Sequence, residues 1–109
     1  MARDPGLEEM LWEDLDGQPG LATKAMFGGL AWLLDGNLLC AASQKGMLVR
    51  LGKGQDGWAL QRGGVEPLRM TDRAMPGWLR AGPDAYGDDA LRRELIAAAL
   101  AFVRTLPPK

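Results

Sequence analysis

Apolar residues recur with a helical period at both ends of the chain and with a strand-like period between them. The N-terminal apolar stripe fits one helix face and consists of Leu7, Met10, Leu11 and Leu15. Asp4 followed by Pro5 is typical of a helix start, because the carboxylate caps free backbone N–H groups and proline suits the first turn. The pattern predicts a first helix that ends at Asp16-Gly17.

The C-terminal stripe is longer and predicts the clearest helix of the chain. Its apolar positions are Leu91, Leu95, Ala98, Ala99, Phe102 and Leu106. Asp88 or Asp89 is expected to cap this helix, and Pro107-Pro108 is expected to stop it. Four charged residues lie off the stripe: Arg92, Arg93, Glu94 and Arg104.

Alternating residues between the two helices predict strands. Residues 30–34 form the first strand, and Asp35-Gly36 is a tight hairpin signal after which residues 37–42 return. Lys45-Gly46 marks a second turn before residues 47–51. Turns this short cannot hold a crossover connection, so the sheet is predicted to be antiparallel.

The next segment has a weaker pattern. Residues 58–60 are compatible with a short helix, although neighbouring glycines disfavour it. Residues 65–70 and 78–80 are predicted to form two further strands, linked through residues 71–77. Pro67 places the first of these at a sheet edge, or delays its start, because proline cannot donate to a strand ladder.

Composition removes many kinds of chemistry. The 109 residues contain no histidine and one cysteine, Cys40, so histidine-based catalytic triads and zinc sites of cysteine and histidine are excluded. Hydrophobic residues make up 47% of the chain, enough for one packed domain over residues 1–109. We expect no catalytic residue, metal site or cofactor, and we expect Cys40 to be a small buried hydrophobe.

Charge is balanced overall but unevenly distributed. The formal net charge is −1, yet residues 1–18 carry six acidic residues against Arg3. This acidic helix is either a solvated face or a surface that faces a partner.

The chain has no signal-peptide pattern and no apolar run of membrane-spanning length, so we expect a cytoplasmic protein that does not enter a membrane. Direct nucleic-acid binding is not expected, because the four tryptophans lack a dense basic surface.

Two glycine-containing segments need interpretation. Residues 52–57 match G-x-G-x-x-G, but hairpin-linked strands do not form the parallel βαβ unit of a dinucleotide site, so we interpret them as a turn. Met26, Phe27, Gly28 and Gly29 precede an apolar strand. The glycines there indicate positive φ, a bulge or close backbone approach; the alternative is an anion-binding nest of N–H groups.

Several blocks together resemble a known family. The segments at residues 24–30, 34–37, 47–51, 75–78 and 101–109 are similar to those of the N-terminal domain of the TfoX/Sxy competence-regulator family. The resemblance implies an α+β fold of the secretion-chaperone-like type, an antiparallel sheet with helices packed on one face. It also implies a regulatory background without established catalytic residues. Full-length competence regulators carry a second, helical domain, so a role in competence is not carried over to a chain that stops at Lys109.

We therefore expect a non-enzymatic regulatory domain that binds a protein. The rival hypothesis is a small-molecule-binding or enzymatic domain that uses a cleft between sheet and helices. A homodimer is also expected as a possible state, because helices on one face leave the other face and the sheet edges to be covered. Either Trp32 or Leu33 must point to that other face, since neighbouring residues on a strand diverge.

Overall fold

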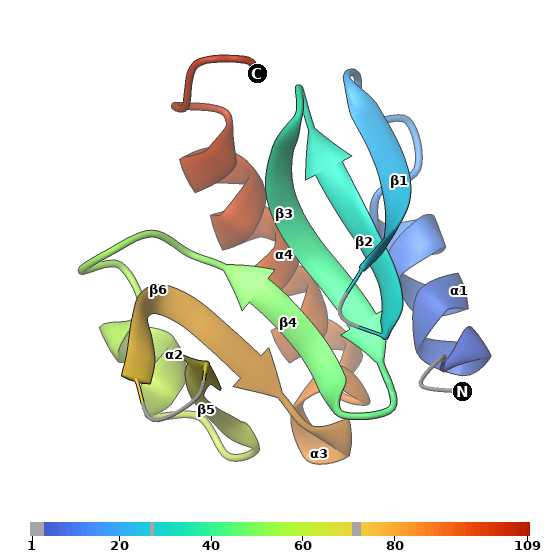
Figure 1. Ribbon diagram of the computed structural model, residues 1–109. Coiled ribbons are helices and arrows are strands. Elements are labelled where there is room, and N and C mark those ends of the chain that lie inside the picture. Colours follow the sequence, from blue (N-terminus) through green and yellow to red (C-terminus); the bar gives the residue numbers. More distant parts are fainter. Residues whose placement is uncertain (1–3, 27, 71–72) are drawn as a thin grey trace.

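Six strands and four helices make up the fold, shown in Figure 1 as a computed structural model that describes residues 4–26, 28–70 and 73–109. The helices are α1 (Pro5–Asp14), α2 (Gly57–Leu60), α3 (Pro83–Tyr86) and α4 (Asp89–Val103). The strands are β1 (Leu21–Met26), β2 (Gly29–Leu34), β3 (Asn37–Ser43), β4 (Gly46–Arg50), β5 (Val65–Met70) and β6 (Arg73–Ala81).

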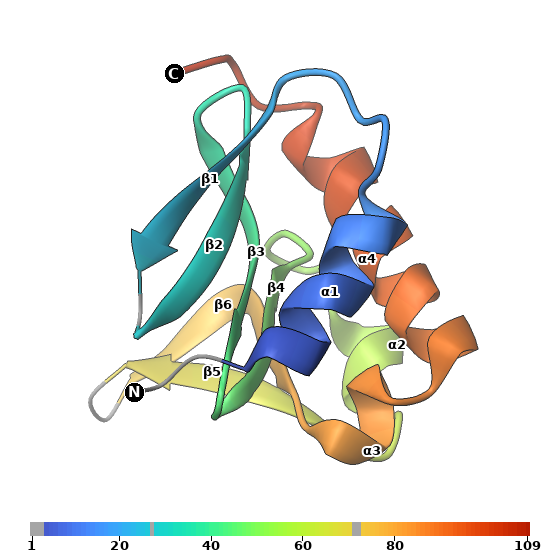
Figure 2. The same ribbon diagram turned by 90° about the vertical axis from the view of Figure 1, so that its right-hand side faces the viewer.

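The strands form one antiparallel sheet with the order β1-β2-β3-β4-β6-β5. Figure 2, which looks along the sheet, shows all four helices on one side of it. The outer strands bend away from the helices, so the other face, which we call the open face, is concave (Figure 2). The predicted α+β class and the antiparallel sheet are confirmed.

The core lies between the sheet and the helices. A row of paired residues crosses four strands on the helix side, and Trp32, Cys40, Val49 and Leu79 in this row are all 0% exposed. Leu11 from α1 and Leu95 from α4 are equally buried above the sheet. Full burial of one such side chain stabilises the fold by about 1.5–3 kcal/mol, so this layer supplies most of the stability.

Helix starts follow the sequence prediction. The Asp4 side chain accepts a hydrogen bond from the Leu7 N–H group at 3.1 Å, and Pro5 opens α1. Of the two candidate caps of α4, Asp88 is the one used: its Oδ1 accepts from the Leu91 N–H group at 3.2 Å. The strand that contains Pro67, β5, lies at the edge of the sheet as predicted.

Three elements differ from the prediction or were absent from it. The predicted 71–77 link is wrong, because β6 begins at Arg73 and continues through Gly77. Gly77 has φ +83, and a Cβ there would lie 2.4 Å from the Gly52 carbonyl carbon, so only glycine permits this bend. The sequence pattern also missed β1, whose residues are mostly exposed at the other edge, and α3, which is a single turn.

A buried ion pair joins α1 to α4. Arg92 lies off the apolar stripe, yet its side chain is only 3% exposed. Its Nε donates to Asp14 Oδ2 at 2.6 Å, and its Nη1 donates to Asp89 Oδ1 at 2.7 Å and to the Tyr86 carbonyl at 3.0 Å. These bonds compensate the guanidinium for its lost hydration, so the cluster fixes the two helices relative to each other.

Candidate functional site

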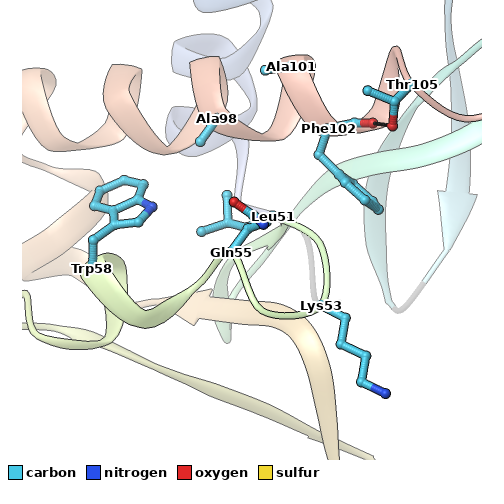
Figure 3. A pocket seen from close by; sticks show the side chains of 8 residues that line it. All are labelled: Leu51, Lys53, Gln55, Trp58, Ala98, Ala101, Phe102 and Thr105. Atoms are coloured by element: carbon cyan, nitrogen blue, oxygen red, sulfur yellow. Dashed lines mark hydrogen bonds between the residues drawn. The ribbon is translucent and has the colours of Figure 1, made fainter.

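An open pocket of about 460 Å³ lies between α4 and the loop that leads from β4 to α2 (Figure 3). Its lining residues are Leu51, Lys53, Gln55, Trp58, Ala98, Ala101, Phe102 and Thr105. Leu51 and Phe102 form the floor near the core, while Trp58 stands on α2 as a wall and is 36% exposed. The two alanines on α4 are small, and this leaves the space between helix and loop unfilled.

Glycines shape the loop that forms one side of the pocket. Gly52 has φ +99, and a Cβ there would lie 2.5 Å from Phe102 Cδ1, so the backbone can pass close to the ring only with glycine at this position. The Gln55 N–H group donates to the Gly52 carbonyl at 3.0 Å, which closes a turn. The helix that follows has four residues and the sheet is antiparallel, so residues 52–57 form a turn without the βαβ geometry of a dinucleotide site.

Two neutral polar groups, the Gln55 amide and the Trp58 indole nitrogen, point toward the middle of the pocket beside Leu51 (Figure 3). The Lys53 side chain extends away from the space enclosed by Trp58 and Phe102 (Figure 3). The Thr105 hydroxyl donates to the Phe102 carbonyl at 2.6 Å and is thereby occupied. Among the described lining residues none is acidic. The pocket therefore offers a mostly apolar surface with two neutral polar groups, but no pair of groups for acid–base catalysis.

The residues singled out in the sequence lie in a different part of the molecule. Met26 ends β1, Gly28 follows with φ +72, and Gly29 begins β2, paired with Met26. A Cβ on Gly29 would lie 2.0 Å from the Ala42 carbonyl oxygen on the neighbouring strand. Each glycine thus has a backbone requirement of its own, and Phe27 lies outside the described residues. None of the three described residues lines the pocket.

Cys40 is unsuited to act as a nucleophile. Its side chain is 0% exposed in the core row of β3. Burial, with a smaller contribution from the charge of Asp14, raises the pKa of its thiol far above the usual range. The thiol therefore stays protonated, and a thiol without thiolate character is unreactive.

Sequence reasoning missed the pocket although it identified several of its residues. The sequence pattern places Ala98 and Phe102 on the apolar stripe of the last helix and Trp58 in a possible short helix. The available signal was the width of the apolar surface on α4. This surface includes Ala97, Ala98 and Ala101 and is wider than one sheet face can cover. That signal predicts an exposed apolar helix surface, but the nearby loop cannot be placed from it.

Comparison with known proteins gives one match. The family model described as TfoX N-terminal domain matches residues 13–103, which include all six strands, the whole of α4 and seven of the eight lining residues of the pocket. No curated protein and no solved structure matches the chain. Within the described residues, no helix has both the length and the apolar character needed to span a membrane.

Proposed function

Because this chain belongs to the TfoX N-terminal domain family, we propose that it is a regulatory domain that acts by binding another protein and has no catalytic centre. The observation that carries the proposal is the open pocket beside α4, whose lining is mostly apolar and has no acidic residue. A large apolar side chain of a partner needs no polar counterpart to fill such a space, because removal of apolar surface from water drives its binding.

The surroundings of the pocket also support a protein partner. Trp58 is 36% exposed, and tryptophan is enriched among the residues that dominate binding energies. Ala101 is exposed on α4 where the helix borders the pocket, so the backbone of a partner can approach the helix closely at this position. The contact area would then extend beyond the pocket itself, as an interface between proteins requires.

The rival candidate is a small-molecule-binding or enzymatic domain that uses this same cleft between sheet and helices. The volume favours it, because about 460 Å³ falls within the range of roughly 300–1,000 Å³ that is typical of ligand pockets. However, such sites normally combine apolar walls with a few convergent polar groups and with titratable residues of shifted pKa. The lining residues offer two neutral polar groups but no carboxylate, so we prefer the protein partner.

Photo-crosslinking in the native host tests this proposal. A photoreactive phenylalanine analogue replaces Trp58, at the pocket wall, or Ala97, which is exposed on α4 but does not line the pocket. We expect position 58 to give one dominant protein adduct after illumination and position 97 to give much less of it. Mass spectrometry of the adduct then identifies the partner.

Two outcomes would contradict the proposal. The first is the absence of any protein adduct from position 58 in cells that contain the folded protein. The second is a small molecule that remains bound to the purified chain in native mass spectrometry and is released when Ala101→Arg fills the pocket. That second result would establish the rival function.

A further inference from the structure

The open face of the sheet carries apolar residues that do not belong to the core. Leu33, Leu38 and Leu48 are half-buried, and none of them packs against the buried cluster beneath the helices. Ala31 and Ala41 are 0% and 3% exposed and are also outside that cluster. No described helix lies over these residues (Figures 1 and 2). The face therefore has an apolar centre of its own.

Charged residues flank this centre on both sides. One row of paired positions crosses all six strands on the open face, in the order Lys24, Ala31, Ala41, Leu48, Arg80 and Glu66. Lys24 stands at one end of the row, and Arg80 stands near the other. Arg69 and Arg80 line a cavity of about 250 Å³ together with Glu66 and Pro67. Basic side chains thus lie at both edges of the apolar centre.

The two layers of the molecule have opposite charge. The six strands carry five basic residues and one acidic residue, whereas the four helices carry seven acidic residues and two basic ones. Within the described residues, no carboxylate lies within 4.0 Å of a charged nitrogen of Lys24, Arg69 or Arg80. Within the part of the chain that the structure describes, these three cations therefore form no ion pair.

The Arg50 side chain is already held in place by two aromatic rings, one of which, Phe102, belongs to α4 and lines the pocket. Its guanidinium carbon lies 5.0 Å from the centre of the Trp78 ring and 5.5 Å from that of Phe102. Aromatic faces attract a guanidinium but do not use its N–H donors, which remain available to an acceptor. Because the side chain is fixed before binding, less conformational entropy is lost when a carboxylate binds to it.

We propose that the open face binds an acidic amphipathic segment of a partner protein, as a second docking surface in addition to the pocket beside α4. The apolar side chains of that segment contact Leu33, Leu38 and Leu48, and its carboxylates accept hydrogen bonds from Arg50, Arg80 and Lys24. Arginine suits this role because its planar fork matches a carboxylate in a bidentate arrangement.

Two other occupants fit less well. A second copy of this chain, docked face to face, would bring together two strand layers that each carry five basic residues and one acidic residue, and like charges oppose such a contact. A single-stranded nucleic acid needs aromatic faces on which bases stack. On this face the central residues are aliphatic, and Trp78 is already contacted by Arg50.

Selection from a random peptide library tests the proposal without knowledge of the partner. Displayed peptides of about 16 residues, roughly four helical turns, are selected on the full chain and sequenced. We expect enriched peptides to carry apolar residues at i, i+3 or i+4 and an excess of Asp and Glu. Their affinity for the chain should fall as salt is raised, because exposed charges are screened.

Two charge reversals localise the binding. Arg80→Glu changes the open face, and Arg62→Glu makes the same change on the helix side, where Arg62 forms an exposed ion pair with Glu94. We expect Arg80→Glu to weaken the selected peptides by about tenfold or more and Arg62→Glu by less than about twofold. Lys24→Glu, at an exposed position, serves as a second open-face reversal if the Arg80 variant melts at a lower temperature.

Each result decides between specific alternatives. The proposal is overturned if the enriched peptides are neutral or basic. It is also overturned if they bind the Arg80→Glu and Lys24→Glu variants as tightly as they bind the unaltered chain. The proposal is also overturned if a single-stranded oligonucleotide binds the chain more tightly than any selected peptide does. A dimer seen by light scattering, with crosslinks that place Leu48 in its interface, overturns it as well. None of these results concerns Trp58 or Ala101, so the proposed function of the pocket stands or falls separately.

Discussion

Two neighbouring rows of the sheet, one residue apart on each strand, have opposite characters. The row that faces the helices contains Trp32, Cys40, Val49 and Leu79, all 0% exposed. The adjacent row on the open face runs from Lys24 through two alanines and Leu48 to Arg80 and Glu66. The same strands therefore supply both faces, and alternation alone separates them. The comparison teaches that residues of the open face can be changed without altering the core row that supplies the stability.

The largest effect is expected at the ion pair that holds the helix layer together. Arg92→Met should lower the free energy of unfolding by about 3–5 kcal/mol, because Asp14, only 5% exposed, is left charged and without its main partner. Arg93→Met is the matched control: its side chain is 66% exposed and its Nε lies 3.5 Å from Asp14, so the loss should stay below about 1 kcal/mol. Urea denaturation measures both, and equal losses would contradict a structural role of the buried pair.

A pair of leucines tests the two faces directly. Leu79→Ala removes a fully buried side chain from the core row and should cost about 2–5 kcal/mol through lost burial and the cavity that remains. Leu48→Ala, on the neighbouring strand but on the open face, should cost less than about 1 kcal/mol, since its side chain is half-buried and outside the core. Thermal unfolding of the two variants gives the comparison. If Leu48→Ala were as destabilising as Leu79→Ala, the open face would have to be part of the folding core.

The glycine at the start of β2 has a smaller predicted effect. Gly29→Ala should cost about 1–3 kcal/mol, because the added Cβ meets the Ala42 carbonyl oxygen and the strands must shift. Gly63→Ala serves as control, as nothing lies within 4 Å of a Cβ there and its φ is not positive, so its effect should stay within about 0.5 kcal/mol. Melting temperatures with and without millimolar phosphate distinguish the two roles of the glycines. A phosphate-dependent gain that disappears in Gly29→Ala, with unchanged apo stability, would favour the anion-nest alternative.

The smallest effect concerns pH. The hydrogen bond and charge of Arg92 hold the pKa of Asp89 below its ordinary value. A carboxyl with a lowered folded-state pKa adds stability above its unfolded pKa, near 4, and that stability is lost as the pH falls through the lowered value. Asp89→Asn should therefore melt below the unaltered chain at about pH 6, and the difference should shrink below about pH 4. A difference that is constant with pH would show that the Asp89 charge contributes nothing to folding.

Regular segments of this fold could be predicted from the sequence, and irregular ones could not. The caps of α1 and α4, the hairpin at Asp35-Gly36 and the edge position of Pro67 follow from local rules, which act within a few residues. The bend of β6 at Gly77 depends on its contact with Gly52, which is distant in sequence, so the pattern there suggested a loop. Burial of Arg92 likewise depends on Asp14, a residue on another helix.

The candidate sites were even less accessible to sequence reasoning. The pocket requires the loop at residues 52–57 to lie against Ala98 and Ala101, and no periodicity encodes that distance. The positive open face could be recognised only once strand register showed which basic residues share a side. Net charge near zero concealed it, because the acidic helices offset the basic strands.

The central claim, that binding uses a surface outside the core, is tested most directly by calorimetric titration of the purified crosslinked partner into two α4 variants. Ala101→Arg fills the pocket, whereas Ala97→Arg makes the same change at an exposed position that does not line it. The account predicts that Ala101→Arg weakens binding by about tenfold or more while Ala97→Arg changes it by less than about twofold, with similar melting temperatures. Equal affinities of the two variants for the partner would contradict it.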